Sequence, residues 1–144
     1  MKRLVLILLA ALMLLAVSCG EKVEEVEYKE AESSVNAFLD CLKNDRYDDA
    51  VELMHSGFYA EAGEIQVFVE SKEVMWGLDF ADMTTPIYKN FEPSYYDASF
   101  SGSFYRLSGT FKLEEYTVSF YFDVAKFKGE YGISNFDFTL VADK

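Results

Sequence analysis

The sequence has few of the residues from which metal and redox sites are built. Its 144 residues include two cysteines and one histidine, and neither a CxxC pair nor an HExxH motif occurs. Zinc sites need several cysteine or histidine ligands, so this composition argues against zinc. A GxSxG elbow and a glycine-rich phosphate loop are also missing. We therefore predict no metal and no cofactor, although carboxylate-bound magnesium or calcium stays open in so acidic a chain.

Basic residues are scarce as well. Only 13 lysines and arginines stand against 25 aspartates and glutamates, which gives a net charge of −12 at pH 7. A surface this acidic repels phosphate groups, so we expect no nucleic-acid partner. Hydrophobic residues make up 51% of the chain and aromatic residues 17%. This composition excludes a disordered chain and predicts one globular domain.

Long apolar runs are absent after Val17. The only one is Leu4–Val17, an unbroken apolar stretch of 14 residues that follows the basic pair Lys2-Arg3. It is shorter than the ~20 residues that a membrane-spanning helix needs. Its length and basic start are typical of a signal peptide, which we assign to residues 1–18.

The end of this leader, Leu15-Ala16-Val17-Ser18-Cys19-Gly20, resembles a bacterial lipobox. Ala16 departs from the pattern, since leucine is commoner three places before the cysteine. The resemblance implies that Cys19 is diacylated and that the protein is an extracytoplasmic lipoprotein of the cell membrane or outer membrane. The residue after the cysteine is Gly20, whereas an aspartate at that position favours retention in the inner membrane. The alternative is an ordinary secretory leader with an incidental Cys19.

Residues 19–32 are predicted to form an acidic tether, and residues 33–144 the folded domain. The segment Gly20–Glu32 carries six glutamates against two lysines, and its distal end can be helical. Cys41 has no cysteine partner if Cys19 is acylated, so we expect it to pack as a small apolar residue.

The first part of the domain has helical periodicity. Apolar residues at Val35, Phe38, Leu39 and Leu42 predict a helix that starts near Ser33 or Ser34. Two more helices are expected at Tyr47–His55 and Glu64–Trp76, the latter capped by Gly77.

After Pro86 the period changes to two, which predicts strands at Tyr105–Leu113, Tyr116–Lys126 and Tyr131–Val141. The alternation slips near Asn135, which indicates a β-bulge. Ile87–Phe100 is expected to give one or two further strands. The sequence therefore predicts an α+β domain in which helices pack on an antiparallel sheet of about four strands.

The segment Ser33–Met54 resembles the N-terminal part of nuclear-transport-factor-2-like domains, in which an aromatic-acidic-acidic-alanine sequence, here Tyr47-Asp48-Asp49-Ala50, starts the second helix. The ending Gly129–Ile133 followed by Phe136–Phe138 resembles the last strand of that family, although a tryptophan is usual near Tyr131. The resemblance implies a cone in which helices cover a curved sheet. It does not assign an activity.

Some members of that superfamily are enzymes of the ketosteroid-isomerase or polyketide-cyclase kind, which place acidic, tyrosine or histidine side chains inside the cone. The candidates here are Asp123 and His55. His55 ends a predicted helix, where the helix dipole favours it as a cap. Strand parity places Asp123 on the polar face with Ser119 and Tyr121. A catalytic role for either is the alternative hypothesis, and we assign no catalytic residue.

Four aromatic side chains are candidates to line an apolar pocket between helices and sheet: Trp76, Tyr105, Tyr121 and Phe122. The other interpretation is that these rings only fill the core. Tyr121, with Tyr95 and Tyr96, is a candidate for a partner-binding patch. We therefore predict a lipid-anchored, non-enzymatic protein that binds a small apolar ligand or a protein partner, or that forms a homodimer through the open sheet face.

Overall fold

The computed structural model describes residues 25–58, 60–94 and 102–142. The lipobox-like segment with Cys19, and Tyr95 and Tyr96, lie outside the described residues. The chain divides into two units, Met1–Glu30 and Ala31–Lys144. In the first unit, residues 25–30 are helical, and Lys29 forms an exposed ion pair of 2.7 Å with Glu25.

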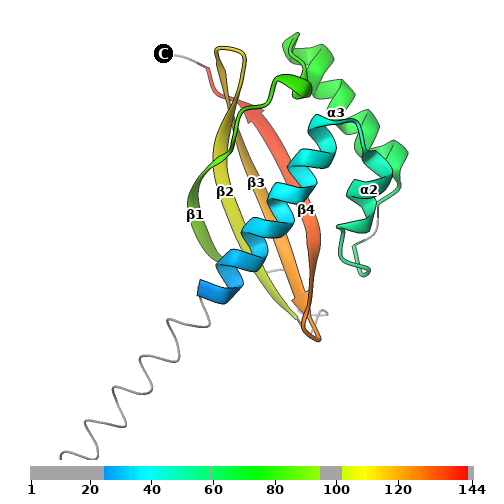
Figure 1. Cartoon of the computed structure of the whole chain (residues 1–144), viewed down its shortest axis with the longest axis vertical. Helices are drawn as coiled ribbons and strands as arrows, with labels where there is room; N and C mark the ends of the chain where they lie inside the picture. The colour runs from blue at the N-terminus through cyan, green and yellow to red at the C-terminus, as the bar shows by residue number, and fades with distance from the viewer. Residues whose placement is uncertain (1–24, 59, 95–101, 143–144) are drawn as a thin grey trace, which may run out of the picture. The chain divides into compact units, whose positions relative to one another are not determined.

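The second unit is an α+β domain whose helices precede a four-stranded antiparallel sheet (Figure 1). Its helical elements are residues 31–43, α2 (Tyr47–Glu52), α3 (Ala62–Trp76) and the short 3₁₀ turn η1 (Phe80–Asp82). Its strands are β1 (Ile87–Ser94), β2 (Ser103–Leu113), β3 (Tyr116–Phe127) and β4 (Glu130–Leu140), in the spatial order β1-β2-β3-β4. The predicted fold class is confirmed, and the curved sheet is consistent with the nuclear-transport-factor-2-like cone.

Some element boundaries differ from those predicted. Ser33 and Ser34 lie among helical residues on both sides, so neither starts a helix. The second helix ends at Glu52, because the chain then turns to pair with β4. The segment Ile87–Ser94 is one strand that includes Pro93. An edge strand accepts proline, because the missing N–H then faces away from its only neighbour.

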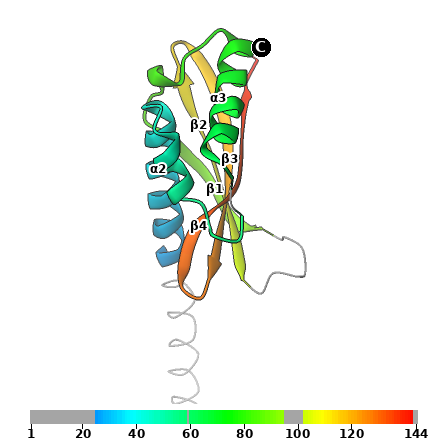
Figure 2. The same cartoon turned by 90° about the vertical axis from the view of Figure 1, so that its right-hand side faces the viewer.

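The helices cover one face of the sheet, and in Figure 2 the helix of residues 31–43 lies beside the sheet as a second layer. The core between them is built from phenylalanine rings. Phe122 on β3 is fully buried, with ring centroids 5.6 Å from Phe38 on the helix and 5.7 Å from Phe136 on β4. Phe68 of α3 meets Phe136 at 5.3 Å. Rings from helices and strands therefore fill this side of the sheet.

A bulge in β4 lets its apolar residues reach that core. Asp123 pairs with Asn135 and Val124 with Ile133, so Ser134 is the extra residue. The predicted bulge near Asn135 is confirmed. It restores Ile133 to the inner face, where it is fully buried.

Two glycines have structural roles that other residues would not fill. Gly77 ends α3 with a φ of 68°, as predicted for the cap. At Gly132 a Cβ would lie 2.5 Å from both the Cα and the backbone N of His55. This close approach lets the segment after α2 pack directly against β4.

Candidate binding surface

Asp123 lies on the face of the sheet that carries Tyr121, as the strand alternation predicted. The side chain is fully buried, and both carboxylate oxygens accept hydrogen bonds from Arg106, at 2.7 Å from Nε and 2.8 Å from Nη2. The guanidinium also lies 4.3 Å from the centroid of the Tyr121 ring. The carboxylate is thus engaged by Arg106 and shielded from solvent. The geometry therefore supports a structural role for Asp123.

His55 is buried in the turn that follows α2, three residues after the last helical one. Its backbone N–H donates to the Ile133 carbonyl at 2.9 Å, and its Nδ1 accepts from the Gly57 N–H at 3.1 Å. This second hydrogen bond engages the lone pair of Nδ1. His55 thus fixes a turn against β4 and does not cap a helix.

The structure does not bring together the four aromatic side chains predicted to line a pocket. Trp76 stacks on Phe80 at a centroid distance of 6.2 Å, and Tyr105 stacks on Phe91 at 5.3 Å. Phe122 is fully buried in the core, and Tyr121 lies on the opposite face of the sheet. These rings pack against protein neighbours in separate places.

The polar face of the sheet carries a shallow hollow of about 300 Å³. Most of its lining side chains are polar: Lys89, Asn90, Ser108, Thr110, Ser119, Tyr121, Asp137 and Thr139, with Gly109 and Phe120.

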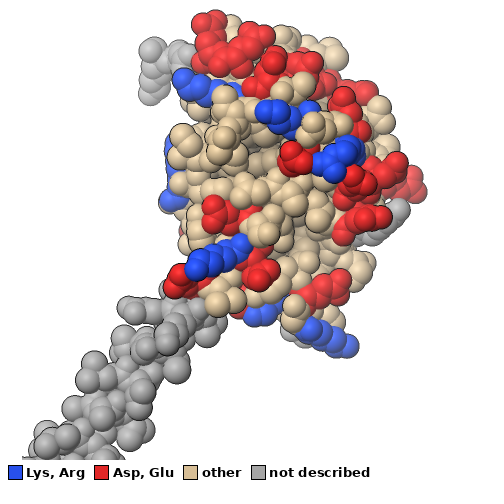
Figure 3. Space-filling view, in the orientation of Figure 1, with Lys and Arg blue, Asp and Glu red and all other residues tan. Residues whose placement is uncertain are grey.

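A larger groove of about 590 Å³ lies between α2 and α3. It is lined by Asp45, Tyr47, Asp48, Ala62, Gln66, Glu70, Glu73 and Asp79. Five of these eight residues carry a carboxylate. Figure 3 shows many acidic side chains on this side of the domain.

No basic side chain in the described part of the chain forms an ion pair with these five carboxylates. Tyr47 donates to Asp45 at 3.0 Å, and the Phe80 N–H donates to Glu73 at 2.9 Å. Burial, together with repulsion from Asp79 and other nearby carboxylates, raises the pKa of Glu73 although the bond from Phe80 opposes this. The groove is therefore a region of negative potential.

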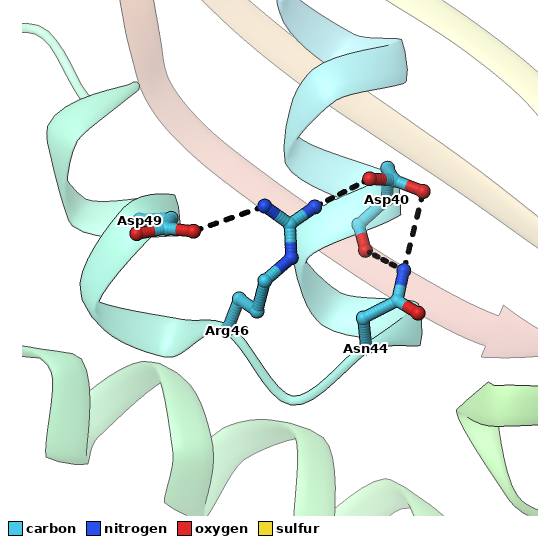
Figure 4. A network of polar contacts seen from close by, with 4 residues as sticks. All are labelled: Asp40, Asn44, Arg46 and Asp49. Carbon is cyan, nitrogen blue, oxygen red and sulfur yellow. Dashed lines mark hydrogen bonds and ion pairs between the residues drawn. The ribbon is translucent and has the colours of Figure 1, made fainter.

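The basic residue that stands between Asp45 and Tyr47 in the sequence is engaged elsewhere. Arg46 bridges Asp40, at the end of the helix of residues 31–43, and Asp49 of α2, the second contact at 2.9 Å (Figure 4). Asn44 donates to the Asp40 carbonyl at 2.7 Å. This network fixes the start of α2, and with it one wall of the groove.

The outer side of α3 exposes three large apolar side chains. Val67 is 66% exposed, Val74 84% and Met75 73%, whereas Ile65 and Val69 on the inner side are buried. We call Val67, Val74 and Met75 the α3 ridge. The ridge was not predicted from the sequence, because the prediction of this helix used only the apolar residues of its inner face. Apolar residues seven and eight positions apart, opposite that face, were the signal that could have revealed it.

The described residues also bear on metal binding and on membrane spanning. Among residues 25–58, 60–94 and 102–142, no group of three or more histidine, cysteine or acidic side chains is arranged to hold a metal ion. Within the same residues, no helix combines the length and the apolar character required to cross a membrane. In comparisons with known proteins, no family model and no curated protein matches the chain.

Proposed function

We propose that this protein is a lipid-anchored, extracytoplasmic domain that binds a protein partner in the cell envelope and catalyses no reaction. The observation that carries the proposal is the α3 ridge, because large apolar side chains exposed on one side of a helix mark interaction surfaces. The resemblance of residues 15–20 to a lipobox supports the anchor.

A protein partner fits the domain better than a small apolar ligand does. The inner face of the sheet is filled by its own rings, of which Phe122 and Phe138 are fully buried. The two larger hollows are lined mainly by polar and acidic side chains. Apolar ligand sites are instead lined mostly by hydrophobic residues.

The anchor is tested by metabolic labelling with an alkyne fatty acid in the native host. The wild type and Cys41→Ser should incorporate label and sediment with membranes. Cys19→Ser should lose both properties. Equal labelling of the two serine variants would overturn the proposed anchor.

The partner is tested by placing a photo-crosslinking amino acid at Val74 in living cells. The matched control is Ile87, which is also a large exposed hydrophobic residue, at 67% exposure, but lies on β1. Crosslinks at position 74 that are missing at position 87 would support the proposal. An absence of crosslinks at position 74, with the protein stably expressed, would overturn it.

A further inference from the structure

We infer that the α3 ridge and the adjoining acidic groove together bind a positively charged amphipathic helix of a partner protein. This inference rests on the proposed function, and it adds the chemistry of the partner. The surface is the exposed side of α3, with the groove between α2 and α3 along one margin.

The ridge is not explained by the stability of α3 itself. Val67 and Val74 are β-branched, and valine at an exposed helix position is less favourable than alanine by about 0.5 kcal/mol. They are seven residues apart, and therefore lie on the same side of the helix. Side chains that cost helix stability and stay exposed in the free domain are suited to burial by a partner.

The groove lies beside the ridge over most of α3. Its α3 wall is formed by Ala62, Gln66, Glu70 and Glu73, which recur every three or four residues. Glu70 comes three residues after Val67 and four before Val74, so a carboxylate stands beside the apolar stripe. Apolar and acidic side chains thus lie next to one another on the exposed side of one helix of 15 residues.

A helix is the partner element that matches this shape. Helices pack side by side when the ridges of one enter the grooves of the other. A partner helix laid along α3 would place apolar side chains on Val67 and Val74. Its lysine or arginine side chains would enter the groove, where five carboxylates have no ion-pair partner among the described residues.

Other occupants fit the charge less well. An anionic membrane surface would be repelled by the carboxylates beside the ridge. A second copy packed on the same face would bring acidic groove against acidic groove. The chain's own segment Gly20–Glu32 carries six glutamates and would be repelled as well.

The test uses the full mature, lipidated chain in nanodiscs of neutral phosphatidylcholine, with empty discs as the blank. The probe is a fluorescent peptide of about 18 leucines and lysines, roughly five helical turns, with all leucines on one face. Binding is followed by fluorescence anisotropy. We expect binding that weakens at least about tenfold between about 50 and 300 mM salt. A leucine–glutamate peptide of the same pattern should not bind.

Paired variants separate the groove from net charge. Asp48→Asn/Glu70→Gln removes two groove charges and should weaken binding roughly three- to tenfold. Glu114→Gln/Glu115→Gln removes two charges at the β2–β3 turn and should change binding less than about twofold. Val67→Ser/Val74→Ser should weaken binding roughly tenfold without unfolding the domain, because both side chains are exposed.

Equal weakening by the two charge variants would overturn the inference, since only net charge would then matter. Equal binding of the leucine–glutamate peptide would overturn it too. Crosslinks from position 74 to a partner without a basic helix, to a second copy or to lipid would also overturn it. Crosslinks to a partner without a basic helix, or to a second copy, would leave the proposed protein-binding function in place.

Discussion

The helical and sheet halves of the domain differ sharply in how they hold charge. Residues 31–82 contain twelve carboxylates and three basic side chains, whereas residues 83–144 contain eight and six. The sheet half buries Asp123 against Arg106. The helical half leaves the carboxylates of its groove without ion pairs among the described residues.

The two halves also use apolar side chains differently. The strands place most of theirs in a shared ring core, with Ile87 on β1 an exposed exception, while α3 exposes Val67, Val74 and Met75. Under the proposed function, this contrast is a division of roles: the sheet face supplies most of the stability, and the outer side of the helices supplies the recognition surface. Four substitutions test that division, and we describe them from the largest expected effect to the smallest.

Phe122→Ala should give the largest loss. The ring is fully buried and contacts rings from both layers, so its removal should lower the free energy of unfolding by about 3–5 kcal/mol. Urea denaturation of the mature chain measures this loss. The control is Ile87→Ala on the exposed edge strand, expected to change stability by less than about 0.5 kcal/mol. Similar losses in both variants would contradict the described core.

Asp123→Asn should lower the free energy of unfolding by about 1–3 kcal/mol, because Arg106 loses a buried charged acceptor. The matched change is Asp137→Asn, which removes the carboxylate of a more exposed pair with Lys72, at 3.1 Å. That control should cost less than about 1 kcal/mol. If the order of the two losses were reversed, the sheet half would not depend on its buried pair.

Glu73→Gln should reveal the burial and charge repulsion of this carboxylate in the acidic groove through the pH dependence of the free energy of unfolding. The pKa of Glu73 is raised above the ordinary 4.5, so the folded protein holds this proton more tightly than the unfolded chain does. The resulting stability is present at low pH and is lost as pH rises through the raised value. The glutamine variant should therefore match the wild type near pH 4 and exceed it slightly near pH 8, by roughly 0.5 kcal/mol or less. Thermal unfolding at both pH values, with Glu115→Gln as the control for losing one surface carboxylate, measures this. A gain only at low pH would contradict it.

Val74→Ala should have the smallest effect on stability. The side chain is 84% exposed, and alanine is the better helix former, so the free energy of unfolding should change by no more than about 0.5 kcal/mol. The same substitution at the fully buried Val69 should cost roughly 1–3 kcal/mol. Urea denaturation compares the two. A large loss at Val74 would mean that the α3 ridge serves the fold and not a partner.

The sequence predicted the parts of the fold that depend on local pattern. Strand alternation predicted β2, β3 and the bulge near Asn135, and the conformational freedom of glycine predicted the α3 cap at Gly77. It could not predict the end of α2, because the hydrogen bond between the His55 N–H and the Ile133 carbonyl joins residues 78 positions apart.

The candidate surface depended on long-range arrangement in the same way. The alternation of strand residues placed Asp123 on the correct face of the sheet. It could not predict the ion pair, because the register between β2 and β3 brings Arg106 beside Asp123. The acidic groove joins Asp45 and Asp48 to Glu70 and Glu73 across two helices, which no sequence period connects. The spacing of the α3 ridge, in contrast, is a local feature of the sequence, with apolar residues at positions 67, 74 and 75.

The position of Lys72 affects how readily two copies of this domain could pair through their sheet edges. Its ammonium group donates to the Phe138 carbonyl at 2.8 Å and to Asp137 at 3.1 Å, which places a positive charge on the backbone of β4. An edge strand with free carbonyls can template a neighbour's strand, and a lysine placed there discourages such pairing. Copies of this domain at high local concentration would meet often. This one side chain would then help to keep neighbouring sheets from joining through β4.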